Sequence, residues 1–182
     1  PSNVKPPDVG MLKTRTTSID ETGNDINTQA TIGETINYTV KATLPALTTF
    51  GTNAKITDTP DSATTQPIIG TPTATLNNGP LPSGWSISTS GQTVTVNIPD
   101  NYPVDATPDV VLISISTRVA DVAGNTIGGL RDNRANITWK DNTVRSPNSN
   151  LVQTRIVEPK IAQGKTNDVN PGTALPGQLV TY

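Results

Sequence analysis

Apolar and polar residues alternate along several segments of this sequence, and this pattern constrains the fold more than any other feature. In Glu34–Leu44, every second residue from Ile36 onward is apolar or aromatic, and Thr, Asn or Lys stand between them. The same alternation recurs in Gln92–Ile98, Val111–Val119 and Asn133–Trp139. A period of two is typical of a strand with one buried and one wet face. Shorter strands are predicted at Val9–Thr16, Ala54–Thr59, Thr73–Leu76 and Trp85–Ser88.

Turn-forming residues separate these segments, as in Gly23-Asn24-Asp25, Asn77-Asn78-Gly79-Pro80 and Gly128-Gly129. No segment of ten or more residues shows the 3.6-residue period of an amphipathic helix. Many short strands with alternating faces predict an all-β fold, an antiparallel β-sandwich or barrel.

The composition removes several classes of function. The chain has no Cys and no His, which excludes disulfides, zinc fingers and Ser-His-Asp triads within it. Its net charge of −2 gives no basic field to hold nucleic acid, and no apolar run is long enough to span a membrane. No cofactor and no metal are expected. The first residues lack Met and a signal-peptide core, so we expect a mature or excised piece of a protein.

The end of the chain resembles its beginning. Pro7-Asp8-Val9 followed by Lys13-Thr14 matches Pro159-Lys160-Ile161 followed by Lys165-Thr166. The segment from Ile32 to Tyr38 then matches the segment from Pro176 to Tyr182. A period of about 150 residues is the size of one domain rather than of a solenoid unit. The alternative is that two Thr-rich β segments resemble each other by composition alone.

The repeat predicts a division of the chain into three parts. Residues 1–149 form one complete domain, residues 150–160 a linker, and residues 161–182 the first strands of a second, incomplete repeat. If the repeat is real, the parent protein is a longer tandem array.

Three polar residues fall on predicted inward faces. Lys13 is in phase with the apolar residues of its strand, Asp58 is in phase with Ile56, and Asn133 leads the inward set that continues with Ala135. Polar groups on apolar faces are costly unless they are paired. Burial favours a neutral lysine, which is a nucleophile, and a neutral aspartic acid, which can hydrogen-bond an amide carbonyl. Attack of the lysine on the asparagine amide, with loss of ammonia, would give an intramolecular isopeptide bond.

Four motifs together resemble a known family. Gly33–Val40, Ile56–Pro60 and Asn133–Trp139 look like the signature strands of Ig-like, isopeptide-forming repeat domains of bacterial fimbrial and cell-surface proteins. Val157–Lys160 resembles the connector between domains of such arrays. The resemblance spans the chain and implies an antiparallel Ig-like β-sandwich.

Site residues follow from this resemblance position by position. It implies Lys13 as the nucleophile, Asn133 as the electrophile and Asp58 as the assisting acid, with Lys165 as the equivalent lysine of the next domain. The chain departs from the family in having little aromatic content to enclose these residues.

Each site residue also has a purely structural interpretation. Lys13 could be an exposed strand lysine, Asp58 could start the turn before Pro60, and Asn133 could cap the last strand. Asn136 is the rival electrophile if the predicted register is wrong.

Two other features have a functional and a structural interpretation. The segment Asp20–Asp25 is rich in oxygen ligands that could bind Ca²⁺, or it is an acidic turn; it lacks the spacing of an EF-hand loop. Trp85 is either an exposed aromatic for ligand binding or a core residue.

The favoured function is a structural repeat domain of an extracellular bacterial surface or fimbrial protein, rather than an enzyme. Its partners are then neighbouring copies or domains of the same protein. The alternatives are an adhesin module that binds a host protein or glycan, an accessory β-domain of a secreted enzyme, and a surface-layer or filament subunit whose strands dock on the next copy.

Overall fold

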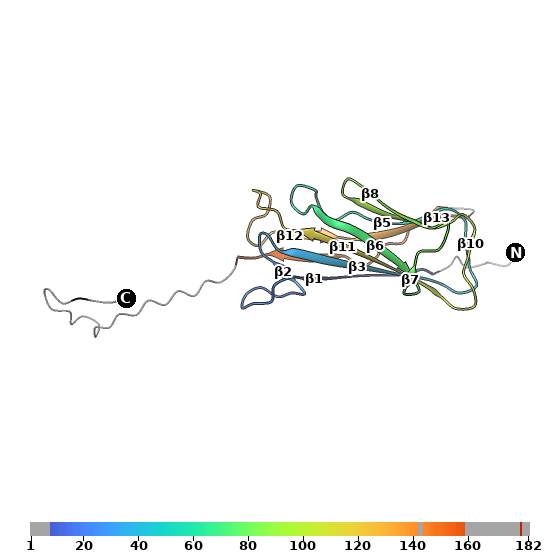
Figure 1. The fold of residues 1–182 in the computed structure, drawn as a ribbon, viewed down its shortest axis with the longest axis horizontal. Helices are drawn as coiled ribbons and strands as arrows, with labels where there is room; N and C mark the ends of the chain where they lie inside the picture. Colours follow the sequence, from blue (N-terminus) through green and yellow to red (C-terminus); the bar gives the residue numbers. More distant parts are fainter. Residues whose placement is uncertain (1–7, 142–143, 159–178, 180–182) are drawn as a thin grey trace.

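The computed structural model describes residues 8–141, 144–158 and 179 (Figure 1). These residues form fifteen strands and no helix. The strands are β1 (Gly10–Thr17), β2 (Gln29–Ala30), β3 (Thr35–Leu44), β4 (Thr49–Phe50), β5 (Thr52–Asp58), β6 (Ile68–Leu76), β7 (Gly79–Pro80), β8 (Ser86–Ser90), β9 (Thr93–Asn97), β10 (Tyr102–Pro103), β11 (Asp109–Arg118), β12 (Leu130–Asn133), β13 (Ala135–Lys140), β14 (Val144–Arg145) and β15 (Val152–Ile156).

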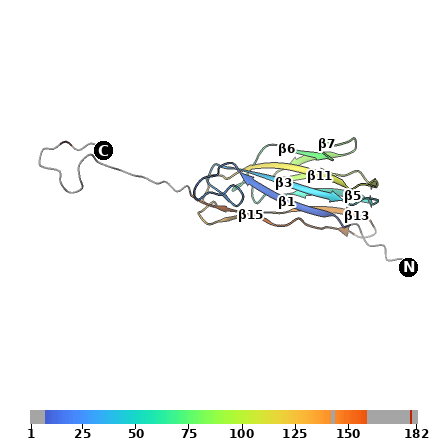
Figure 2. The same cartoon turned by 90° about the horizontal axis from the view of Figure 1, so that it is seen from below.

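Two five-stranded sheets form the sandwich, with strand orders β1-β3-β11-β6-β7 and β14-β13-β5-β9-β8. Two smaller sheets, β12-β15-β2 and β10-β4, complete it. Neighbouring strands are antiparallel except β15 and β2, which run parallel. Figure 2 shows the layer of β1, β3, β11 and β6 beside the layer that contains β5 and β13. The predicted all-β antiparallel sandwich is confirmed.

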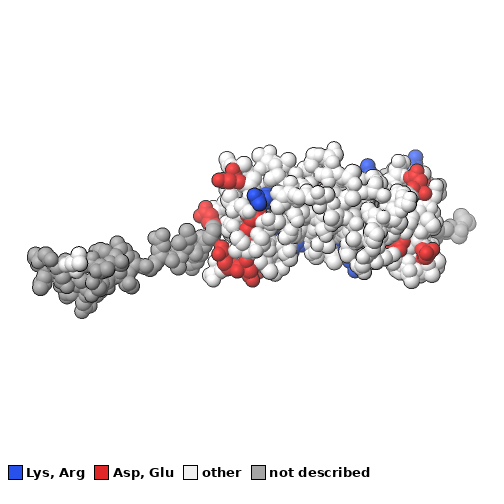
Figure 3. Space-filling view, viewed as in Figure 1, with Lys and Arg blue, Asp and Glu red and all other residues white. Residues whose placement is uncertain are grey.

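The alternation in the sequence determines which faces meet in the core. In β3, Ile36, Tyr38, Val40, Ala42 and Leu44 are all buried. Thr and Lys side chains point outward between them, because successive residues of a strand face opposite sides. The side of the molecule shown in Figure 3 is largely uncharged, and its acidic groups gather toward the two ends of the domain.

One predicted strand is two strands in the structure. Arg134 separates β12 from β13 inside the segment Asn133–Trp139. β12 pairs with β15, whereas β13 pairs with β5 and β14. Asn133 therefore ends one ladder, and Ala135 begins the other.

The predicted linker 150–160 is wrong over its first half. Val152–Ile156 form β15, which is antiparallel to β12 and parallel to β2. Val152, Thr154 and Ile156 are buried and alternate with exposed residues, so this short segment has the same two-residue period as the longer strands. The domain therefore extends past residue 149, at least to Ile156. Residues 159–178 and 180–182, and with them most of the predicted second repeat, lie outside the described residues.

The few aromatic residues are used in the core. Phe50 packs edge-on against Trp139, with ring centroids 5.3 Å apart, and Trp85 packs in the same way against Tyr102 at 4.9 Å. Trp85 is 8% exposed, so the core interpretation of this residue is confirmed. Within the described residues, no helix has the length and apolarity needed to cross a membrane.

Candidate functional site

Lys13 lies inside the sandwich. It occupies an inward position of β1, where the strand alternates between exposed and buried residues, and it is only 1% exposed. Its Nζ contacts a carboxylate oxygen of Asp58, which lies in the opposite sheet. Burial lowers the pKa of Lys13, and the neighbouring Asp58 carboxylate opposes that shift. The surroundings therefore ease formation of the neutral, nucleophilic amine.

Asp58 is the last residue of β5 and is also 1% exposed. It stands opposite Ala135 of β13 and Val94 of β9 in the second sheet. One carboxylate oxygen meets Lys13 Nζ, and the other, Oδ1, is buried without a hydrogen-bond partner in the described part of the chain. This oxygen is thus left unsatisfied in the core of the described structure.

Asn133 ends β12 and is 2% exposed. Neither its Nδ2 nor its Oδ1 has a hydrogen-bond partner among the described residues. A buried amide without partners costs about 1–3 kcal/mol per unsatisfied group, which is a cost that an ordinary structural asparagine avoids. Asn133 therefore does not serve as a strand cap.

Asn136, the rival from the sequence, has a different environment. Its Nδ2 lies within hydrogen-bond distance of Ser146 Oγ, the Pro147 carbonyl and Asn148 Oδ1. These contacts satisfy the amide at the periphery of the fold, so Asn136 is a structural residue. The predicted register, with Asn133 inward, agrees with the observed burial.

Tyr38 encloses the lysine, which sequence reasoning did not recognise. The centroid of its ring lies 4.7 Å from Lys13 Nζ, and its hydroxyl accepts a hydrogen bond from Gln66 Nε2 at 2.8 Å. Both Tyr38 and Gln66 are buried. The register of β1 against β3 explains this contact. Lys13 pairs with Val40, which places Tyr38 diagonally beside Lys13 on the same face of the sheet. That register was not available from the sequence.

The burial of Tyr38 predicts loss of stability in alkali. Burial raises the pKa of Tyr38 from 10 to about 12, so the unfolded chain releases this proton first as the pH rises. The stability that Tyr38 contributes is complete below pH 10 and is lost as the pH rises through about 12. The loss should amount to roughly 2–3 kcal/mol. Unfolding free energies measured on both sides of this window should show it, and Tyr38→Phe should show a smaller slope; equal slopes would contradict the assignment.

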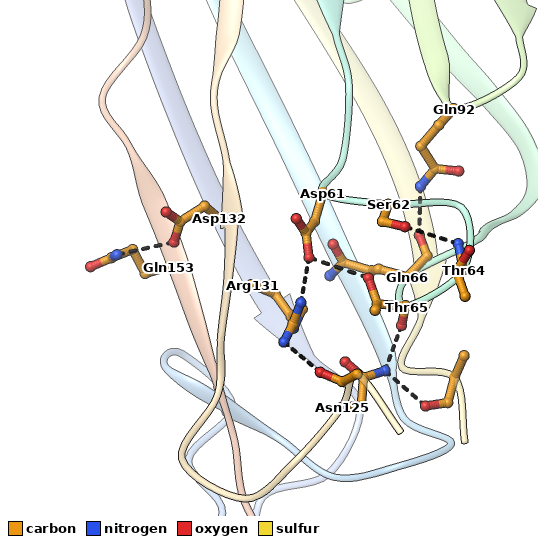
Figure 4. A network of polar contacts seen from close by, with 12 residues as sticks. Asp61, Ser62, Thr64, Thr65, Gln66, Gln92, Asn125, Arg131, Asp132 and Gln153 are labelled. Atoms are coloured by element: carbon orange, nitrogen blue, oxygen red, sulfur yellow. Dashed lines mark hydrogen bonds and ion pairs between the residues drawn. The ribbon is translucent and has the colours of Figure 1, made fainter. Parts of the chain in front are cut away.

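A polar network holds the strand that carries Asn133 (Figure 4). In β12, Arg131 Nη1 lies 2.8 Å from Asp61 Oδ2, and its Nη2 donates to the Gly124 carbonyl at 2.8 Å. Asn125 Nδ2 donates to the Thr65 carbonyl at 2.7 Å. These bonds tie the loops after β5 and β11 to the start of β12.

Two other candidates from the sequence are the acidic segment Asp20–Asp25 and Lys165. In the segment Asp20–Asp25, Asp25 Oδ1 accepts hydrogen bonds from Asn27 N–H and from the Thr28 hydroxyl. No group of three or more acidic side chains that could hold a metal ion occurs in the part of the chain described. The two hydrogen bonds of Asp25 are those of an Asx-type turn. Lys165 lies outside the described residues.

Comparison with known proteins gives fold neighbours only. No family model and no curated protein matches the chain. Among solved structures, the major pilin BcpA of Bacillus cereus matches with a TM-score of 0.62 and 18% identity, over 82% of this chain and 40% of that one. Domains D2 and D3 of the major pilin SpaD of Corynebacterium diphtheriae match with a TM-score of 0.56 and 16% identity, over 80% and 52%. The N-terminal domain of the Streptococcus gordonii adhesin Sgo0707 matches with a TM-score of 0.58 and 16% identity, over 80% and 32%.

The chain shares the Ig-like sandwich fold of domains in these solved pilin structures. The resemblance seen in the sequence motifs is thus confirmed at the level of fold. The chain spans about half or less of the length of these pilin structures. In this fold, the contact between Lys13 and Asp58 joins the two large sheets across the core.

Proposed function

We propose that this chain is a structural domain of a bacterial surface fimbria or pilus, stabilised by an isopeptide bond between Lys13 and Asn133 that Asp58 promotes. The observation that carries the proposal is the Lys13–Asp58 contact in the core, together with the buried and unpartnered amide of Asn133. A buried ion pair is weak as a source of stability, so its presence calls for another reason. Formation of the bond supplies that reason.

The reaction needs only these three side chains. Asp58 takes a proton from Lys13 Nζ, and the neutral amine attacks Cγ of Asn133. The tetrahedral carbon then expels the amide nitrogen of Asn133, which leaves as ammonia after receiving the first proton from Asp58. The second proton of Lys13 Nζ passes to the Asp58 carboxylate, so Asp58 ends neutral. One N–C bond forms between Lys13 and Asn133 and one C–N bond of the Asn133 amide breaks, so atoms and charge balance without an oxidant or a cofactor.

The bond would join β1, which carries Lys13, to the end of β12, which carries Asn133. It would enclose 120 residues of chain (133 − 13 = 120). By the chain-entropy treatment of cross-links, closing a loop of that size removes about 4–5 kcal/mol of unfolded-state entropy. A pulling force on the domain would pass through the covalent link and bypass the strands between.

The wider setting of the proposal is a filament or stalk on the cell surface. Pilin subunits are among the fold neighbours, and they support an assembly in which neighbouring copies or domains of the same protein are the partners. The repeat near the C-terminus supports a tandem arrangement, with Val157–Lys160 as part of the connector and Lys165 as the equivalent lysine of the next domain. This role involves no turnover of a substrate.

Intact mass spectrometry tests the proposed bond. The purified chain should weigh one ammonia less than its sequence requires. Proteolysis should release two peptides that stay joined, one with Lys13 and the other with Asn133. Lys13→Ala and Asn133→Ala should each restore the full mass. Full mass in the parent chain would overturn the chemical proposal and leave the fold.

An adhesin module is the second candidate, supported by the likeness to the adhesin Sgo0707 domain. Such a module would be expected to present aromatic side chains for a host glycan or protein. Among the described residues, the exposed large hydrophobic side chains are all aliphatic, and Trp85 and Trp139 are buried. The structural role is therefore favoured over ligand binding.

A further inference from the structure

The side chain of Asn150 makes two hydrogen bonds to the main chain of Lys13. The Lys13 N–H donates to Asn150 Oδ1 at 2.8 Å, and Asn150 Nδ2 donates to the Lys13 carbonyl at 2.9 Å. The side-chain amide therefore offers one donor and one acceptor, as a residue of a neighbouring strand would. It acts on the strand that carries the nucleophile and not on the reacting atoms.

The residues on both sides of Asn150 reach the other two members of the site. The Ser149 N–H donates to the Ala135 carbonyl at 2.9 Å, and Ser149 Oγ accepts from the Ala135 N–H at 3.0 Å. Ala135 is the residue opposite Asp58 in the β13–β5 ladder. Val152 stands opposite Asn133 in the β12–β15 ladder. The segment 149–152 thus connects the strand positions of all three residues.

The sheets alone do not align Lys13 with Asn133. Among the described strands, β1 is an edge strand whose only ladder partner is β3, and β12 belongs to another sheet. A shift of β1 by one residue would turn Lys13 to the outer face. Asn150 opposes such a shift because both of its hydrogen bonds are made to Lys13 itself.

We propose that Asn150 is a positioning residue that holds Lys13 level with Asn133 for bond formation. This inference rests on the proposed function. An amine that attacks an amide must lie within about 3–3.5 Å of the carbon, and a misplacement of about 1 Å can slow such a step by about 100-fold. Asn150 is itself exposed, so its replacement leaves the core packing unchanged.

Timed bond formation in freshly made protein tests this role. The full chain is made by cell-free synthesis, portions are quenched in acid, and the fraction that has lost ammonia is read by intact mass. Asn150→Ala removes both hydrogen bonds, and Asn150→Asp keeps the size and the acceptor but removes the donor. Asn148→Ala is the matched control, since Asn148 is an exposed asparagine of the same segment that contacts Asn136.

We expect ammonia loss to be slower by about tenfold or more in both Asn150 variants, with unchanged circular dichroism, and to proceed at the parent rate in Asn148→Ala. A merely structural role would change the stability of the Asn150 variants without changing this rate. Parent-like rates in folded Asn150 variants would overturn the positioning role while the bond itself stands. A parent chain that never loses ammonia would instead overturn the proposed bond, and the positioning role with it.

Discussion

Asn133→Ala should lower the free energy of unfolding by about 4–5 kcal/mol while leaving the Lys13–Asp58 pair in place. The variant cannot form the bond, so its unfolded chain regains the entropy of a 120-residue loop (133 − 13 = 120). The Asn133 amide makes no hydrogen bond in the described structure, so its removal breaks none. The loss would therefore report the cross-link itself.

Urea or thermal unfolding of the two proteins measures this difference. Asn136→Ala is the matched control, because Asn136 lies three residues further along the chain, in β13, and its amide contacts peripheral groups. It should cost about 1–2 kcal/mol and keep the mass deficit of the parent. Equal stability of the parent and Asn133→Ala would show that no cross-link contributes.

Asp58→Ala should destabilise the fold strongly even where no bond can form. In an Asn133→Ala background, it leaves the Lys13 ammonium buried opposite an apolar residue, which typically costs about 3–5 kcal/mol. Burial already lowers the pKa of Lys13, and loss of Asp58 removes the interaction that opposes this shift. In the otherwise unchanged chain, Asp58→Ala should also restore the full mass.

A compensating variant separates charge from packing. Adding Lys13→Met to the Asp58→Ala, Asn133→Ala protein removes the buried charge at similar side-chain length, and most of the lost stability should return. Urea unfolding of the single, double and triple variants gives the comparison. If the triple variant is no more stable than the double, the cost of Asp58→Ala is one of packing and the ion-pair account is wrong.

Much of the fold could be predicted from the period of the sequence. β3, β9 and β11 follow the alternation that the sequence shows, because one face of each is buried over five or more residues. β15 was missed although it alternates equally well. Its five residues form a strand through pairing with β12 and β2, which are distant in the chain, and short strands without such a partner are marginal.

The three residues of the candidate site could be predicted from the sequence, but the residues that surround them could not. Lys13, Asp58 and Asn133 could be found because each is a polar residue in phase with an apolar strand face. Tyr38 and Asn150 could not be assigned, because their roles depend on contacts made across strand registers and between segments far apart. A tyrosine in a strand and an asparagine in a predicted linker carry no such information by themselves.

By itself, the sequence determined that this chain is all-β and that three polar groups face its core, because side-chain direction in a strand depends only on local alternation. Tertiary structure alone decided which of these groups meet. Lys13 contacts Asp58 because two sheets pack face to face, and Asn150 fixes Lys13 from a segment more than a hundred residues away. Contacts of that range depend on how sheets stack, and no period along the chain encodes the stacking.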